Sequence, residues 1–276
     1  MVVFASFVAP DLDLDLLPYW VRHYDSFKFD KYHVVLHIRN PEETRLCHFQ
    51  SSILIEDCVS AAKNMMLSRG WTVDVTTGDF ENSVLQRKCL DGIKAGLSPE
   101  DTLVVADSDE FQDMPANYKE IAEKHPAVTG TLIDRWDYRL HDAAPSDEHS
   151  LARLLEEYPQ SGNLYETVMS KFNLSIGQSR CRTKILCHKA RYRVPLDGAH
   201  FVGGVEDDNA ILKNRVVHHF TWRAGVVERF ANRIHVGPAW LLAIAEYFQV
   251  PHYDRCFLKI MDRMRDNLLS GKAITL

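Results

Sequence analysis

The stretch that decides the fold is residues 101–111, which read D-T-L-V-V-A-D-S-D-E-F. Its apolar run at 103–105 has the length and composition of a fully buried strand. The run ends at three acids within four residues, Asp107, Asp109 and Glu110. Acids that follow a buried strand lie at the carboxyl edge of the sheet, where open α/β sheets bind their ligands. The stretch therefore predicts a ligand site at that edge.

Asp107 and Asp109 are two residues apart, and on a strand this spacing turns both carboxylates to the same side. Two carboxylates on one side repel each other unless a positive charge lies between them. Mg²⁺ and Mn²⁺, which also bind phosphates, prefer oxygen ligands of this kind. We therefore expect Asp107 and Asp109 to bind Mn²⁺ or Mg²⁺. A solvated acidic turn is the alternative that this stretch alone leaves open.

The residues before this stretch alternate between strand and helix patterns. Short apolar runs predict strands at 2–8, 32–38, 71–77 and 103–105, and helical spacing of apolar residues predicts helices at 16–24, 55–66 and 84–93. This alternation predicts an α/β fold with a mostly parallel central sheet flanked by helices. The loops after successive strands then share one cleft. No strand is followed by G-x-G-x-x-G or by a P-loop, so neither a dinucleotide fold nor a P-loop site is expected.

The second half of the chain is less regular. Strands are predicted at 127–133 and 183–188, a short helix at 150–158, and a hairpin with arms at 200–202 and 216–220. From residue 238 onward the apolar spacing is helical again.

Composition narrows the class of protein. The chain has 276 residues, a net charge of −6 and no block of Lys or Arg, so a nucleic-acid partner is not expected. Six cysteines without a C-x-x-C pair predict neither a zinc site nor a disulfide framework, and favour reduced thiols in the cytoplasm. The apolar N-terminus lacks a preceding basic region and is interpreted as a strand. No apolar run reaches the roughly 20 residues of a transmembrane helix.

Several segments together resemble one family of enzymes. They are V-V-A-D-S-D-E-F at 104–111, F-A-S-F at 4–7, L-P-Y-W-V-R-H-Y at 17–24, G-T-L-I-D-R-W at 130–136, and V-H-H-F-T-W-R-A-G-V-V-E-R-F-A-N-R at 217–233. The set resembles nucleotide-sugar-dependent glycosyltransferases with the A-type fold, in the family-2-like and family-92-like branch with an Asp-x-Asp motif. One departure is that Ala9, Pro10 and Asp11 replace the Asn-Glu pair common after the first strand of family-2 enzymes.

The resemblance implies a single Rossmann-like glycosyltransferase domain over residues 1–276. Residues 1–111 would bind the metal and a nucleotide-sugar, expected to be a UDP-sugar, 112–235 would shape the acceptor side, and 236–276 would be helical. The enzyme would transfer the sugar to a hydroxyl of a glycan acceptor. Peripheral membrane contact through the apolar residues 241–248 stays open. The expected nucleotide contacts are Ala5, Phe7, Asp79, Arg87, Asp107 and Ser108.

In such enzymes a late histidine often completes the metal site, and His200 and His218 are the two candidates. His219 would point the opposite way from His218 on a strand, so at most one of this pair faces the site. Arg223, five residues after His218, is the candidate cation for the departing phosphate.

An inverting reaction also needs a carboxylate that accepts the proton of the acceptor hydroxyl. Asp197 and Asp134 are the preferred candidates in that order, and Glu206 and Asp207 are the alternatives.

Two other functions remain open at this stage. A metal-dependent phosphohydrolase of the haloacid-dehalogenase type also ends an apolar strand in Asp-x-Asp. It does so on the first strand, with Thr or Val at the place that Phe111 takes here. A non-catalytic carbohydrate-binding protein is the third possibility. Loss of metal-dependent nucleotide binding in Asp109→Ala would separate an enzyme from such a binding module.

Overall fold

The computed structural model describes residues 1–38, 54–78, 84–171, 183–192 and 212–224, together with Val226 and residues 243, 244 and 246–249. The strands are β1 (Val2–Val8), β2 (Lys31–Ile38), β3 (Thr72–Thr77), β4 (Thr102–Val105), β5 (Glu110–Asp113), β6 (Ala127–Trp136), β7 (Gln160–Gly162), β8 (Thr183–Lys189) and β9 (Leu212–Trp222). The helices are α1 (Pro10–Asp13), α2 (Leu17–Asp25), α3 (Ile55–Leu67), α4 (Val84–Ala95), α5 (Tyr118–Lys124), α6 (Leu151–Glu157) and α7 (Leu164–Lys171). The architecture is mixed α/β.

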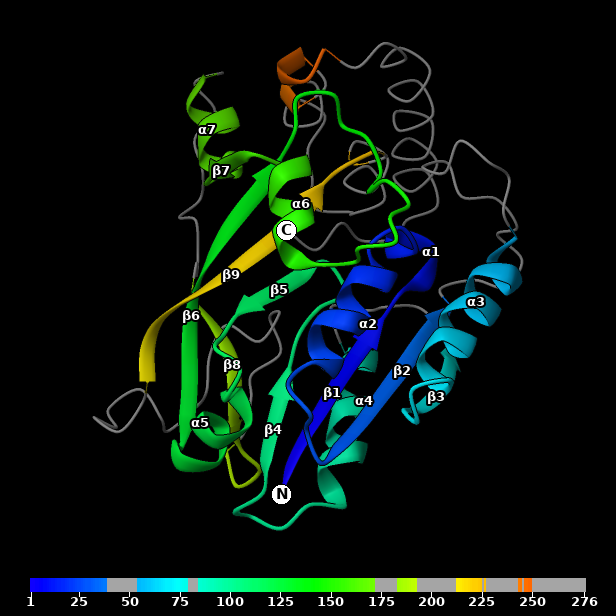
Figure 1. The fold of residues 1–276 in the computed structure, drawn as a ribbon, viewed down its shortest axis with the longest axis vertical. Coiled ribbons are helices and arrows are strands. Elements are labelled where there is room, and N and C mark those ends of the chain that lie inside the picture. The colour runs from blue at the N-terminus through cyan, green and yellow to red at the C-terminus, as the bar shows by residue number, and fades with distance from the viewer. Residues whose placement is uncertain are drawn as a thin grey trace, which may run out of the picture.

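The described strands form one sheet in the order β3-β2-β1-β4-β8-β6-β9-β5, with β7 paired to β6 (Figure 1). Four strand pairs are parallel: β1–β2, β1–β4, β2–β3 and β6–β9. Four are antiparallel: β4–β8, β5–β9, β6–β7 and β6–β8. The expectation of a mostly parallel sheet is therefore wrong. Strand β8 lies between β4 and β6 and is antiparallel to both. The local hydrophobic pattern does not indicate this pairing, because the partners are far apart in the sequence.

The first half of the chain follows the predicted alternation. Strands β1 to β4 and helices α2, α3 and α4 lie where the apolar patterns place them, within a few residues. Helix α3 ends at Leu67 with Ser68 as its C-cap, and Gly70, with φ of 76°, lies in the turn that follows.

Helices cover both faces of the parallel strands β1 and β4. On one face α2 packs on the sheet through an aromatic cluster that includes Phe4, Trp20 and Tyr24, and α3 adds Ala62 and Met66. On the opposite face α4 lies over a smaller apolar cluster from β1 and β4, contributed by Val3, Ala5, Leu103 and Val105. Figure 1 shows α2 in front of β1 and α4 behind it.

The chain changes direction across the sheet at β1. It proceeds from β1 to β2 and β3 on one side, and then returns to β4 on the other side. Open α/β sheets bind ligands outside the carboxyl ends of their strands at such a switch point. A ligand site is therefore expected among the residues that follow β1 and β4.

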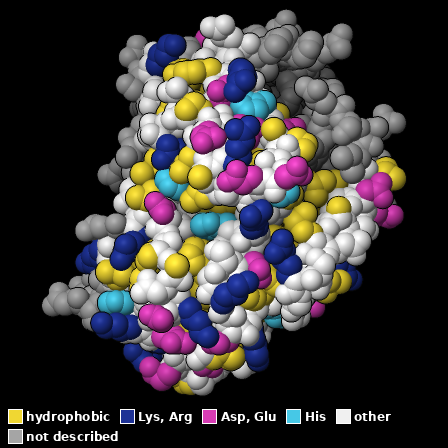
Figure 2. Space-filling model, viewed as in Figure 1, with side chains coloured by type: hydrophobic (Ala, Val, Ile, Leu, Met, Phe, Trp, Pro, Cys, Tyr) yellow, Lys and Arg dark blue, Asp and Glu magenta, His cyan; other side chains and the backbone are white. Residues whose placement is uncertain are grey.

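Basic and acidic side chains are interspersed on the face shown in Figure 2, with no continuous basic stripe among the described residues there. None of the helices in the described part of the chain has the length and apolar character needed to cross a membrane.

The stability of the protein in acid is expected to depend on His23. Its ring is partly buried and packs against Tyr24, Phe27 and Phe111, and its Nε2 lies 3.0 Å from the Gln112 carbonyl oxygen. Burial lowers the pKa of His23 to about 4, against the opposing effect of that hydrogen bond. Between pH 6.5 and 4 the unfolded chain therefore binds a proton that the folded chain does not, so stability falls as the pH falls through this window.

We expect His23→Phe to reduce the slope of the free energy of unfolding against pH in this window by up to about 1.4 kcal/mol per pH unit. Urea denaturation at several pH values between 6.5 and 4 measures it. An unchanged slope would show that His23 is already protonated in the folded protein.

Candidate active site

The acids of the sequence motif lie on a turn and not on a strand. Strand β4 ends at Val105 and β5 begins at Glu110, and the Glu110 N–H donates to the Asp107 carbonyl at 3.1 Å. The expectation that Asp107 and Asp109 share one face by strand alternation is therefore wrong. The chain reverses between them, and each carboxylate meets different partners.

The turn is fixed by hydrogen bonds to four of its carbonyl oxygens, from donors on β1, α2 and β9. These are Ser6 Oγ to Ala106 at 2.6 Å, Trp20 Nε1 to Asp107 at 3.0 Å, Phe220 N to Asp109 at 2.8 Å, and Tyr24 Oη to Glu110 at 3.1 Å. A turn fixed from several elements presents its side chains in a defined geometry before any ligand binds, as functional sites require.

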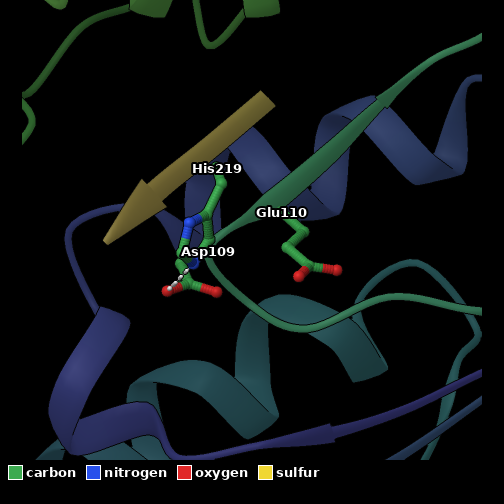
Figure 3. A group of neighbouring side chains, drawn as sticks. All are labelled: Asp109, Glu110 and His219. Atoms are coloured by element: carbon green, nitrogen blue, oxygen red, sulfur yellow. Dashed lines mark ion pairs between the residues drawn. The ribbon is translucent and has the colours of Figure 1, made fainter. Parts of the chain in front are cut away.

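Asp109, Glu110 and His219 form a group that could hold a metal ion. Their candidate ligand atoms all lie within 4.8 Å of one another. The β5–β9 register pairs Glu110 with His219, which brings β9 to the turn. His219 Nε2 lies 3.4 Å from Asp109 Oδ2, and Figure 3 shows this ion pair with the Glu110 carboxylate beside it.

Asp134 lies behind His219. Its Oδ1 is 2.8 Å from His219 Nδ1, and its Oδ2 accepts the Leu164 N–H at the start of α7 at 3.0 Å. Burial alone would lower the pKa of His219, but Asp109 and Asp134 outweigh it and raise the pKa to about 10. Asp134, a predicted catalytic base, therefore has both oxygens engaged and orients His219 instead.

Lys184 on β8 brings a buried positive charge to the same turn. Its Nζ lies 3.0 Å from Asp107 Oδ2 and 2.7 Å from Glu110 Oε1. Burial opposes ionisation of Lys184, but the two carboxylates outweigh burial and hold its pKa above the usual value. Burial raises the pKa of Glu110, and Lys184 opposes that rise.

His218 does not reach the turn. Its Nε2 lies 3.8 Å from Asp113 Oδ2, and its Nδ1 accepts a hydrogen bond from Arg135 Nε at 3.1 Å. Neighbouring residues on a strand face opposite sides, and on β9 it is His219 that faces Asp109. The preference for His218 over His219 is thus revised by the structure.

Arg223 also lies away from the acidic turn's carboxylates. Its guanidinium is 1% exposed and contacts Asp13 Oδ1 at 2.8 Å and Asp15 Oδ2 at 2.9 Å. Ser108 Oγ, expected to contact a nucleotide, donates to Asp13 Oδ2 at 2.6 Å. Arg223 and Ser108 therefore belong to one buried polar network around Asp13, and the contact of Arg223 with a departing phosphate stays a prediction.

Four predicted nucleotide contacts line one pocket at the switch point between β1 and β4. Ala5 and Phe7 come from β1, Arg87 from α4, and Asp107 from the turn. Glu110 and Lys184 line the same pocket. The structure thus brings these six residues together beside the Asp109–Glu110–His219 group.

The remaining predicted site residues, Asp79, Asp197, His200, Glu206 and Asp207, lie outside the described residues. Three residues at the turn were not assigned to the site from the sequence, namely Glu110, His219 and Lys184. A signal existed for Lys184, because a lysine within the apolar strand T-K-I-L-C-H-K needs a buried anionic partner.

Comparisons with known proteins place the chain in no family. No protein-family model matches it, and no curated protein matches it. Among solved structures the chain is similar to a nucleotidyl transferase from Methanothermobacter thermautotroptrophicus, with 17% sequence identity and a TM-score of 0.26. The match covers 51% of this chain and 63% of that protein, so the chain spans less than two thirds of its length. A likeness this distant carries no argument about the site.

Proposed function

We propose that the protein is a metal-dependent glycosyltransferase that uses a nucleotide-sugar, expected to be a UDP-sugar, and a glycan hydroxyl as acceptor. The observation that carries this proposal is the group Asp109–Glu110–His219 at the carboxyl edge of the β1–β4 switch point. The sugar donor and the A-type fold are inferred from the sequence motifs that resemble those of A-type glycosyltransferases, and both are part of the proposal.

The donor set fits Mn²⁺ or Mg²⁺. Two carboxylates and one imidazole suit Mn²⁺ well, and Mg²⁺ accepts the carboxylates. Metal-binding histidines almost always donate their other ring N–H to a carboxylate or carbonyl, and Asp134 accepts from Nδ1 in this way. His219 Nε2 would then be the atom that binds the metal. A divalent ion bound here would stabilise the negative charge of a departing nucleoside diphosphate.

Each protein group then has a separate task. Ala5 and Phe7 form an apolar wall for the nucleoside, while Arg87 and Lys184 supply positive charge along the pocket. Asp107 orients Lys184, and Asp134 orients His219. The bond from the sugar's anomeric carbon to the diphosphate breaks as the acceptor oxygen attacks that carbon. Asp197 stays the candidate base, because Asp134 is engaged at both oxygens.

A thermal-shift screen against nucleotides and nucleotide-sugars, with and without Mn²⁺, tests the proposal. A ligand that binds only the folded state at a hundredfold excess over its dissociation constant adds roughly 2.7 kcal/mol of stability. We expect UDP or a UDP-sugar to raise the melting temperature only when Mn²⁺ is present. No shift with any nucleotide would favour a carbohydrate-binding protein, and release of phosphate from simple phosphoesters would favour the phosphohydrolase.

Asp134→Asn tests the link between Asp134 and His219. We expect it to weaken Mn²⁺ binding about 10- to 100-fold, because loss of a carboxylate partner to a metal-binding histidine typically has this effect. Titration with Mn²⁺ by calorimetry measures the change. Asp137→Asn is the matched control, since the contacts of Asp137 are with Arg139 and His141. Equal affinities for Asp134→Asn and the wild type would refute the positioning role.

A further inference from the structure

Lys184 holds an ammonium in a place that water scarcely reaches. Its side chain is 5% exposed, and its two anionic partners are Asp107 and Glu110. The β4–β8 register explains the contact. Val104 pairs with Cys187, so Lys184 lies on β8 three residues past this pair, on the side of the sheet where β4 ends and the turn begins. A buried ammonium is costly without an anion, so Lys184 depends on these carboxylates.

Glu110 is shared between two possible cations. It contacts Lys184 through Oε1, and it also belongs to the group with Asp109 and His219. A divalent ion in that group lies beside the same carboxylate as the ammonium, and the two positive charges repel each other. The ammonium of Lys184 would then need another anion. Lys184 and Asp107 both line the pocket in which a nucleotide would bind.

We propose that Lys184 is a diphosphate-binding residue that neutralises Glu110 while no divalent ion is bound, and that turns its ammonium to the phosphates when ion and nucleotide bind together. This inference rests on the proposed function, because it assumes a nucleoside diphosphate in the pocket. With Lys184 in this role, the divalent ion binds weakly when it is alone and tightly when the nucleotide is also present.

The proposal predicts effects of opposite sign in one variant. Lys184→Met removes the competing charge from Glu110, so we expect it to tighten the binding of Mn²⁺ alone by about tenfold or more. The same variant loses a charged hydrogen bond to the phosphates, so we expect UDP in the presence of Mn²⁺ to bind about tenfold or more weakly. Electron paramagnetic resonance of free Mn²⁺ measures the first affinity, and calorimetry with UDP measures the second.

Two control variants separate charge from packing. Lys184→Arg keeps the positive charge, and we expect Mn²⁺ alone to bind it as weakly as the wild type. Lys189→Met removes a lysine from the same strand, whose Nζ donates to Thr102 Oγ1 and the Glu123 carbonyl. We expect Lys189→Met to change neither affinity.

A charge-balanced variant covers the case in which Lys184→Met does not fold. Lys184→Met combined with Asp107→Asn leaves net charge unchanged and still frees Glu110, so it too must bind Mn²⁺ alone more tightly. Unchanged or weaker Mn²⁺ binding in the variant that folds overturns the role of Lys184. Failure of wild-type protein to bind UDP with Mn²⁺ overturns the proposed function instead, and the measurement with Mn²⁺ alone still decides the competition for Glu110.

Discussion

Replacing Asp109 with alanine is expected to weaken Mn²⁺-dependent binding of UDP or a UDP-sugar by at least about 100-fold, because a charged ligand contributes several kcal/mol to a metal site. Asp109 Oδ2 lies 3.4 Å from His219 Nε2, and Asp109 lies on the turn that is fixed by hydrogen bonds to four of its carbonyl oxygens. Among the described residues of the group, removing it leaves Glu110 and His219 as ligands. Calorimetric titration of the nucleotide in saturating Mn²⁺ measures the loss.

Asp113→Ala is the matched control for this substitution. Asp113 ends β5, four residues after Asp109, and its side chain is 63% exposed. We expect this variant to bind the nucleotide like the wild type. If Asp109→Ala retained Mn²⁺-dependent binding while its fold was intact, the ion would have to be bound elsewhere, and the proposed site would be wrong.

The second large effect concerns stability and not ligand binding. Arg223 joins β9 to Asp13 and Asp15 in a network that is almost fully buried. Removing one partner of a buried ion pair leaves an uncompensated charge and typically costs about 3–5 kcal/mol. We therefore expect Arg223→Ala to lower the free energy of unfolding by about this amount, as measured by urea denaturation.

Arg139→Ala is the comparison for Arg223→Ala. Arg139 pairs with Asp137 but its side chain is 72% exposed, so its removal should change the free energy of unfolding by no more than about 1 kcal/mol. A similarly small effect for Arg223→Ala would mean that the buried network does not hold β9 to the N-terminal part of the sheet.

The parallel half of the fold was predictable because its signals are local. Each strand from β1 to β4 is a short apolar run, and each connecting helix has its own 3.6-residue spacing. Residues on β1 and after β4 then meet at the carboxyl edge by the rules of handed crossovers. This is why Ala5, Phe7, Arg87 and Asp107, chosen from the sequence, line one pocket.

In the second half the elements β6, β8 and α6 follow their local patterns as predicted, but the pairing of the strands could not be predicted because it is long-range. Strand β8 joins β4 across about 80 positions of sequence, and only that register brings Lys184 to Asp107. The choice between His218 and His219 likewise depends on which face of β9 meets the turn, and a one-residue change of register would reverse it. The Asp-x-Asp spacing was misleading, because the chain turns at Ser108 instead of continuing as a strand.

In the proposed complex, a divalent ion and a nucleoside diphosphate bind together at the turn between β4 and β5. The most direct measurement is the anomalous diffraction of Mn²⁺ in crystals grown with Mn²⁺ and UDP. Our account predicts a peak roughly 2.0–2.3 Å from carboxylate oxygens of this turn and from His219 Nε2, with phosphate oxygens completing the coordination. A peak at other residues, or UDP bound in the pocket with no Mn²⁺ between it and Asp109, would contradict it.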